Sequence, residues 1–407
     1  MQNWKRNAAL FLTGQALSLW GSMIAQYAIV WHVTLATRSG TAMTLFTIVG
    51  LLPMFFISPF AGVWADRFDR KRVINLADGS VAFASLIAAL FLAAGVDSIW
   101  MLLSCVVVRS LGQGVQMPAV GSFIPDIVPA GQLTRVNGLQ GSIQSFAALT
   151  APATSGAMMT FVPLEALFFL DVATAIIGIS IVMFLVKAPG KPTAAGSGER
   201  QGVAYFRDLK EGIRYMRSRG HVLRMIILSS AFFFLSAPAA FLTPLQVTRN
   251  FGDDVWRLSA IEILFSGGML AGGLLISAWG GLKNRIHTMT LSCVLCGLLG
   301  AALGAATNFP LYLVITAALG VSLPLWRAPS MVLLQTTVNP AFMGRVLSVF
   351  AMAPSVMMPL GMVVFGPLAD VISIDAILVA TGVLISLLSI PLVTSKTLIK
   401  AGRASSS

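Results

Sequence analysis

The sequence predicts an all-α membrane protein whose twelve transmembrane helices form two six-helix bundles. Three observations predict it: the composition, a series of long uncharged runs, and one long polar segment near the middle of the chain. The 407 residues are 57% hydrophobic and 10% charged, whereas soluble domains carry roughly 25% charged residues. This composition excludes a soluble enzyme and a disordered chain. In lipid the backbone must satisfy its own hydrogen bonds, which favours helices.

The spans follow from the uncharged runs, since a helix needs about 20 apolar residues to cross a bilayer. Nine runs lack Asp, Glu, Lys and Arg, at 7–37, 39–65, 79–96, 136–164, 225–248, 263–282, 286–326, 346–369 and 376–395. The run 286–326 is long enough for two helices and breaks in a turn at Thr307 to Pro310. Two further apolar stretches, 98–125 and 166–186, each hold one charge. The total is twelve.

The basic residues predict the orientation. With both termini in the cytoplasm, 22 of the 27 Lys and Arg residues lie inside, and only Arg38, Arg249 and Arg257 lie outside. This asymmetry follows the positive-inside rule for a multi-pass protein of the plasma (inner) membrane. The net charge of +12 therefore serves topology and contact with anionic lipid, and we expect no nucleic acid partner.

The domain boundaries come from the polar central segment. We expect a bundle at 1–187, a cytoplasmic linker at 188–220, a second bundle at 221–395 and a cytoplasmic tail at 396–407. In the linker, Phe206, Leu209, Ile213 and Met216 recur at helical spacing, which predicts an amphipathic helix on the membrane surface; a plain solvated helix is the alternative.

The two bundles also resemble each other in sequence. Pro118 and Pro129 match Pro329 and Pro340 at a constant offset of 211 residues. Internal repeats of this size are typical of secondary transporters, whose substrate site lies between the repeats near the membrane midplane.

The loop after the second span, from Gly62 to Arg72, resembles the signature loop of the major facilitator superfamily, with Asp69 where the general pattern has glycine. The resemblance implies a cytoplasmic gate. The candidate gate residues are Gly62, Asp66, Arg67, Arg70, Asp126 and Arg345. We expect Asp66 near the helix that begins at Arg345, and Arg70 paired with Asp126. A simple positive-inside anchor is the alternative.

Within that superfamily, the chain resembles the macrolide-efflux subgroup of the drug:proton antiporters. The resembling stretches are Gly14 to Ser18, Arg109 to Gly112, Gln132 to Thr134, Ile261 to Ile263, Ser266 to Leu270 and Gly344 to Val346. The resemblance implies export of amphiphilic compounds by proton antiport and alternating access, by a protein that is not an enzyme. A siderophore or lipid exporter, or a non-transporting sensor or scaffold, remains an alternative. We expect a monomer.

Ionisable residues inside spans are the candidates for proton coupling, because their burial in lipid is costly. The resemblance ties Arg109 to coupling, and Glu262 is the preferred proton carrier. Asp171 is a third candidate, for which a structural ion pair is the stronger reading. We expect Asp78 to bond the basic loop 67–72.

The substrate cavity is predicted from polar and apolar residues on several spans. Polar residues of the first span recur at helical spacing, which favours a cavity-facing stripe, with interhelical hydrogen bonding as the alternative. The cavity candidates are Gln15, Ser18, Ser22, Gln26, Arg327, Phe233 and Met357. The sequence has no phosphate-binding loop and no metal-ligand motif, so we expect no cofactor and no metal.

Overall fold

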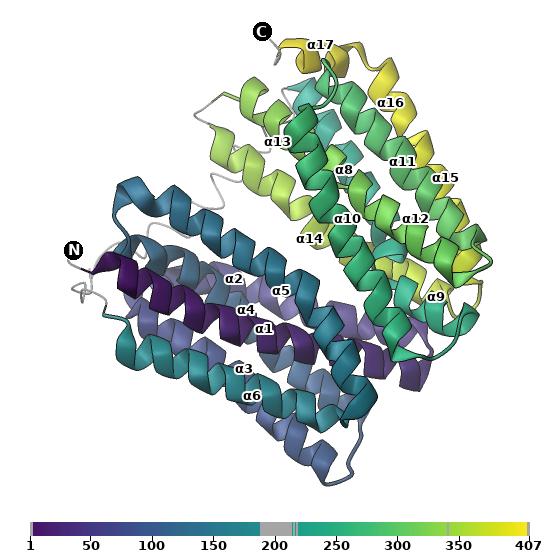
Figure 1. The fold of residues 1–407 in the computed structure, drawn as a ribbon. Coiled ribbons are helices and arrows are strands. Elements are labelled where there is room, and N and C mark those ends of the chain that lie inside the picture. Colours follow the sequence, from purple (N-terminus) through teal and green to yellow (C-terminus); the bar gives the residue numbers. More distant parts are fainter. Residues whose placement is uncertain (1–2, 188–213, 215, 217–218, 340–341, 405–407) are drawn as a thin grey trace. The chain divides into compact units, whose positions relative to one another are not determined.

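The computed structural model describes the chain except residues 1–2, 188–213, 215, 217–218, 340–341 and 405–407. All regular elements in the described part are helices, as the composition predicts. They form two compact units. The first comprises Met1–Ala36 and Leu45–Gly198, and the second comprises Thr37–Thr44 and Glu199–Ser407 (Figure 1).

The first unit contains the elements coloured purple to teal in Figure 1. These are α1 (Trp4–Thr37), α2 (Gly40–Arg67), α3 (Arg70–Ala93), α4 (Ile99–Ile127), a 3-10 turn (Ala130–Gln132), α5 (Leu133–Phe161), α6 (Leu164–Ser180) and a π-helical turn η2 (Ile181–Leu185). By its contacts the start of α2 belongs to the second unit.

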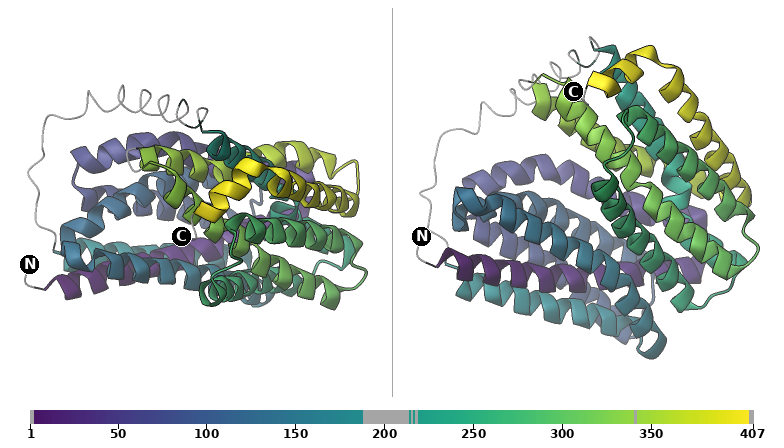
Figure 2. Two further views of the ribbon diagram at one scale, coloured as in Figure 1. Left: turned by 90° about the horizontal axis from the view of Figure 1, so that it is seen from above. Right: turned by 45° about the horizontal axis from the view of Figure 1, so that its top comes forward.

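The second unit contains the helices after the grey segment, coloured teal-green to yellow. These are α8 (Gly220–Phe241), α9 (Thr243–Asn250), α10 (Val255–Trp279), α11 (Arg285–Ala305), α12 (Phe309–Ser322), α13 (Pro324–Thr337), α14 (Met343–Leu368), α15 (Ile374–Leu387), α16 (Ser389–Thr394) and α17 (Lys396–Ala404). Within the unit α10 packs along α12, and α11 packs along α15 (Figure 2).

The described helices are apolar enough for a multi-pass membrane protein. Ten helical segments are long and apolar enough to cross a bilayer, and Pro354–Leu368 of α14 is a shorter apolar helix. α5 is also long, with 29 residues, but less apolar. The predicted break at Thr307 to Pro310 is present: α11 ends at Ala305, and Asn308 caps α12 through the backbone N–H of Leu311. The count of twelve spans stays a prediction.

The two predicted segments outside the bundles have different outcomes. The amphipathic helix of the linker falls mostly on residues outside the described part. The expected tail at 396–407 contains helix α17, which packs on α8 and α11. Arg224 of α8 donates to the hydroxyls of Ser395 and Thr397 and ties this end of the chain to the unit.

Close helix contacts depend on small residues. A Cβ on Gly14 of α1 would lie 2.9 Å from the carbonyl oxygen of Gly178 on α6. In the second unit, a Cβ on Gly297 of α11 would lie 2.5 Å from the Gly382 carbonyl oxygen of α15. Membrane helices associate largely through such packing, because lipid provides no hydrophobic drive between them.

Replacing Gly297 by alanine should destabilise the second unit, because the new methyl group would overlap α15. Overpacking typically costs about 1–3 kcal/mol, and we expect a lower midpoint of thermal unfolding in detergent. Gly300 is the matched control on the same helix, since a Cβ there meets only the Gly382 Cα at 3.8 Å. If Gly300→Ala lowers the midpoint as much as Gly297→Ala does, the packing explanation is wrong.

Candidate functional site

The first unit buries an ion pair between Arg109 of α4 and Asp171 of α6. The Arg109 side chain is 1% exposed, and the Asp171 side chain is 0% exposed. Hydroxyls of Ser22 and Ser85 donate to the two carboxylate oxygens of Asp171, at 2.9 and 2.7 Å. Arg109 also donates to the Ser22 carbonyl oxygen at 2.7 Å. Four helices, α1, α3, α4 and α6, therefore meet at one pair of charges.

Most polar groups of this cluster have hydrogen-bond partners. The guanidinium of Arg109 donates to Asp171 and to the Ser85 hydroxyl, while its Nε–H has no partner among the described residues. Removal of either partner of a buried ion pair leaves an uncompensated charge, which strongly destabilises the fold. The geometry joins Arg109 and Asp171, two of the three residues that the sequence singled out for proton coupling.

A second buried carboxyl, Asp78 of α3, belongs to a group of amides. The Gln15 amide on α1 donates to Asp78 at 3.1 Å, and the Gln116 amide on α4 donates to the Gln15 carbonyl at 2.7 Å. Asp78 is 7% exposed. The expectation that Asp78 bonds the loop 67–72 is therefore wrong: its partner comes from α1, which α3 meets inside the bundle.

Two residues of the polar stripe of α1 belong to these two clusters. Gln15 and Ser22 make interhelical hydrogen bonds, Ser18 is buried, and Gln26 is half-buried. The contacts of Gln15 and Ser22 match the alternative reading of the stripe, interhelical hydrogen bonding. A role in substrate binding stays a proposal for all four residues.

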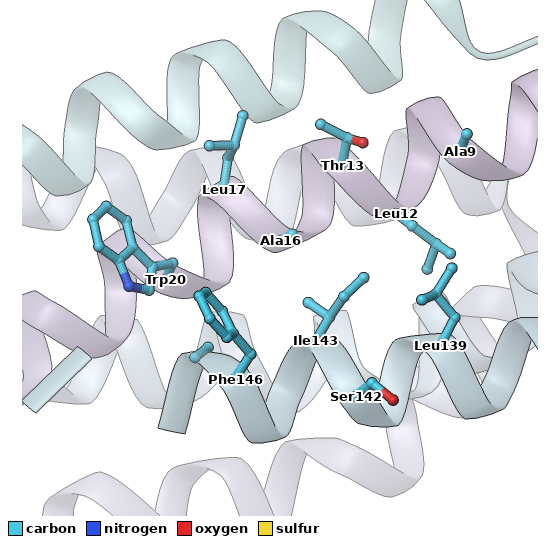
Figure 3. A pocket seen from close by; sticks show the side chains of 11 residues that line it. Ala9, Leu12, Thr13, Ala16, Leu17, Trp20, Leu139, Ser142, Ile143 and Phe146 are labelled. Atoms are coloured by element: carbon cyan, nitrogen blue, oxygen red, sulfur yellow. The ribbon is translucent and has the colours of Figure 1, made fainter. Parts of the chain in front are cut away.

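An apolar groove lies on another side of α1, against α5. Its volume is about 720 Å³, and its lining includes Leu12, Thr13, Ala16, Leu17, Trp20, Leu139, Ser142, Ile143 and Phe146. Figure 3 shows Leu12 and Trp20 opposite Leu139 and Phe146. The Trp20 indole N–H donates to the Thr150 hydroxyl at 3.1 Å, which fixes the ring. The sequence signal for this groove was the apolar face of α1. The predicted cavity residues of α1 were all polar and therefore did not include it.

Arg70, the first residue of α3 after the loop, forms a partly buried ion pair with Asp126 of α4. Arg70 donates to the Asp126 carboxylate at 2.8 Å and to the Ser122 carbonyl oxygen at 2.9 Å. Asp69 caps α3 through the backbone N–H groups of Lys71 and Arg72, which explains an aspartate where the general pattern has glycine. Arg67 is exposed. The side chains of Gly62, Asp66 and Arg345 lie outside the described part, so their gate role stays a prediction.

The candidates in the second unit are spread over several helices. Glu262 of α10, Phe233 of α8 and Met357 of α14 are half-buried, and Arg327 of α13 is exposed. Phe233 packs edge-on against Phe232 at 5.5 Å. The roles of these candidates in proton coupling and substrate binding stay proposals.

A polar cluster at the start of α2 was missed by the sequence reasoning. The Asp370 carboxylate, which follows α14, accepts the backbone N–H groups of Gly40 and Thr41 at 2.6 and 2.9 Å. Hydroxyls of Ser39 and Thr41 donate to the same carboxylate at 2.9 and 2.6 Å. All these residues belong to the second unit. The sequence signal was an acidic residue directly after an apolar helix, although its partner lies 330 residues away.

Arg249 joins this cluster from α9. Its guanidinium donates to the Ala369 and Arg38 carbonyl oxygens, both at 2.6 Å, and lies 3.3 Å from the Asp370 carboxylate. Arg38 pairs in turn with Asp253. Partial burial acts to raise the pKa of Asp370, but the hydrogen bonds from Thr41, Gly40 and Ser39 outweigh it and hold the pKa at about 2. The carboxylate therefore stays ionised at physiological pH.

Removing one partner of the Arg109–Asp171 pair should cost more stability than removing both. Arg109→Leu leaves a buried carboxylate without its cation, for which breaking a buried pair costs roughly 3–5 kcal/mol. We expect the double variant Arg109→Leu with Asp171→Leu to unfold at a higher temperature than Arg109→Leu alone. Thermal unfolding of both variants in detergent measures this, with Arg6→Leu at an exposed site as control. Additive losses would contradict the coupling.

The Asp370 cluster should stabilise the protein independently of pH over the physiological range. Because folding lowers this pKa to about 2, its contribution is fully present above the unfolded value near 3.8 and is lost as the pH falls toward 2. We expect Asp370→Asn to lower the unfolding midpoint by the same amount at every pH from about 8 to 5. A difference that shrinks across this range would contradict the assignment.

Comparisons with known proteins cover most of the chain. The family model of the Major Facilitator Superfamily matches residues 11–362. Macrolide efflux protein A of Streptococcus pyogenes is 29% identical over 390 residues, covering 95% of each chain. The multidrug efflux pump Tap of Mycobacterium tuberculosis is 25% identical over 394 residues, covering 93% of this chain and 91% of Tap.

Solved structures show the same fold. A bacterial homologue of the iron transporter ferroportin, in an inward-facing state, matches with a TM-score of 0.71 at 15% identity, covering 97% of this chain and 100% of that one. A bacterial homologue of the lysosomal transporter Spinster matches with a TM-score of 0.67 at 13% identity, covering 100% and 97%. With its helical units and apolar spans, the chain belongs to the major facilitator superfamily of multi-pass membrane transporters.

Proposed function

We propose that this transporter exports macrolide-like amphiphilic compounds across the bacterial plasma membrane in exchange for protons, by alternating access. The observation that carries the proposal is the fully buried Arg109–Asp171 pair, to which α1, α3, α4 and α6 all contribute. Intramembrane ionisable residues that pair with one another are typical of proton relays in transporters. Both termini face the cytoplasm in this proposal.

Proton exchange requires charged groups whose hydrogen-bond partners change when the protein changes conformation. Ser22 both donates to Asp171 and accepts from Arg109 through its carbonyl, so a movement of α1 changes the partners of both charges. Arg109 is the fixed cation, and Asp171 is its counter-ion. Glu262, half-buried on α10, is the candidate in the second unit for contact with the proton or with a cationic substrate.

The substrate class is supported by similarity and by the groove between α1 and α5. Macrolide efflux protein A is similar over 95% of both chains. The groove, about 720 Å³ in volume and mostly apolar, falls in the range of roughly 300–1,000 Å³ that holds small molecules. Thr13 and Ser142 add hydroxyls to its lining, which suits an amphiphile with a few polar groups.

Alternating access needs contacts that hold one state and can be exchanged. In the proposed orientation the Asp370 cluster lies on the outer side and Arg70–Asp126 on the inner side. The first turn of α2 belongs to the second unit and the rest of α2 to the first. Release of the Gly40 and Thr41 N–H groups from Asp370 would free this turn, so the cluster is a candidate outer lock.

Purified protein in proteoliposomes should accumulate the macrolide erythromycin when a pH gradient is imposed, and Arg109→Ala should abolish this accumulation. The physical reason is that Asp171 loses its counter-ion, which leaves an uncompensated charge inside the bundle. Uptake of radiolabelled erythromycin into inverted vesicles measures the flux. Arg6→Ala, at an exposed position on α1, is the matched control and should transport as the wild type does.

The outcomes separate the proposed function from its alternatives. Accumulation of a siderophore or a fluorescent lipid instead of erythromycin would replace the substrate class and keep the transport mechanism. Erythromycin flux that ignores the pH gradient would overturn proton antiport. No flux of any of these compounds would favour a non-transporting sensor or scaffold.

A further inference from the structure

Three helices of the first unit present polar side chains at two levels, seven residues apart. The lower level consists of Gln15, Asp78 and Gln116, and the upper level of Ser22, Ser85 and Arg109. Seven residues are two helical turns, so the levels lie about 10 Å apart along the bundle. The same helices, α1, α3 and α4, thus carry both clusters.

The two levels differ in how they balance a carboxyl group. Asp171 meets a guanidinium and two hydroxyls at the upper level, whereas Asp78 at the lower level is hydrogen-bonded to an amide. Among the described residues, these two are the buried acids. A buried carboxylate without a paired cation is costly, and pairs of acids in such different surroundings take different protonation roles.

The amides around Asp78 suit both of its protonation states. An amide N–H donates to a carboxylate, and an amide carbonyl accepts from a protonated carboxyl group. Gln15 carries both groups, donating to Asp78 and accepting from Gln116. A guanidinium such as Arg109 can only donate, so it matches the ionised form alone.

Charged groups near Asp78 come from the helices that pack on α3. These are α4 and α6, with the turn η2, and α1, which contributes Gln15. The basic side chains of α1 are the exposed Lys5 and Arg6 and His32, which pairs with Asp97. α4 brings Arg109 and α6 brings Asp171, and η2 carries no titratable side chain. Arg109 pairs with Asp171, so it is not the hydrogen-bond partner of Asp78, which meets the Gln15 amide instead.

We propose that Asp78 takes up and releases the transported proton, while Asp171 stays paired with Arg109. The proposal rests on proton antiport as the function of the protein. A proton that enters from the outer side bonds to one carboxyl oxygen of Asp78, forming one O–H bond and removing one negative charge. Release to the cytoplasm breaks that bond and restores the carboxylate.

Protonation of Asp78 reverses its hydrogen bond with Gln15. The new O–H donates to the Gln15 carbonyl and the Gln15 amide turns, so this carbonyl no longer accepts from Gln116. Because α1 also carries Ser22 and α4 also carries Arg109, the change reaches the upper level two turns away. The proton on Asp78 thereby biases the arrangement of the helices that hold the fixed ion pair.

Asp78→Asn tests this assignment, because an asparagine has the shape of the protonated carboxyl group but cannot exchange a proton. In proteoliposomes we expect the variant to exchange erythromycin between the two sides without a gradient, and to lose accumulation driven by a pH gradient. Asp97→Asn is the matched control. Asp97 lies between α3 and α4, is 55% exposed and pairs with His32, and its variant should keep driven accumulation.

The transport assays test the proposed function and the role of Asp78 separately. If the wild type shows no pH-driven accumulation, the proposed function fails. If the wild type accumulates erythromycin and Asp78→Asn does so with an unchanged pH profile, the assignment of Asp78 is overturned while antiport stands. Proton release when erythromycin binds in weakly buffered detergent, followed with a pH dye, should occur in the wild type and vanish in Asp78→Asn.

Two further variants distinguish proton exchange by Asp78 from a purely structural role of this residue. Asp78→Glu keeps a proton-exchanging carboxyl group and should restore driven accumulation. Gln15→Leu removes the donor to the carboxylate and should shift the pH profile of transport toward higher pH, because the neutral form of Asp78 is favoured. If Asp78→Glu fails to drive accumulation although it unfolds at the wild-type temperature, or if the Gln15→Leu profile stays in place, the proposal is wrong.

Discussion

The first unit depends on the ion pair between Arg109 and Asp171, because a charge in an apolar bundle is tolerated only when its partner is fixed beside it. Because α1, α3, α4 and α6 each supply a group to the pair, replacing one of these groups leaves others without their partners. Tight packing keeps the geometry. A Cβ on Gly21 of α1 would lie 1.9 Å from the Thr174 hydroxyl oxygen of α6, so these helices approach as closely as their backbones allow.

The surroundings of each carboxylate determine what it can do. Asp370 is surrounded by N–H and O–H donors at a helix start and stays ionised, which suits a lock that does not respond to protons. Asp171 is matched by a guanidinium, which suits a fixed anchor. Asp78 has amides as partners, which suit a group that changes its charge. The three aspartates thus differ in chemical behaviour because their hydrogen-bond partners differ.

The sequence predicts the helical membrane fold and the ionisable residues within it, because composition and charge patterning depend on the bilayer alone. It places Arg109 and Asp171 in spans, but their contact is a property of helix packing that spacing along one chain cannot give. The misplaced partner of Asp78 has the same cause, since proximity to the loop 67–72 in sequence suggested a bond that α1 makes instead. The Asp370 cluster joins residues more than 300 positions apart, so an acidic residue after an apolar helix does not indicate its partner.

Coupled movement of protons and drug is the central claim, and counter-flux measures it directly. Vesicles that contain the wild-type protein and a trapped pH dye are given an outward erythromycin gradient with no pH gradient. The account predicts that erythromycin leaving the vesicles drives protons inward, so the lumen acidifies until an ionophore collapses the gradient. Erythromycin that crosses with no change in lumenal pH would contradict it.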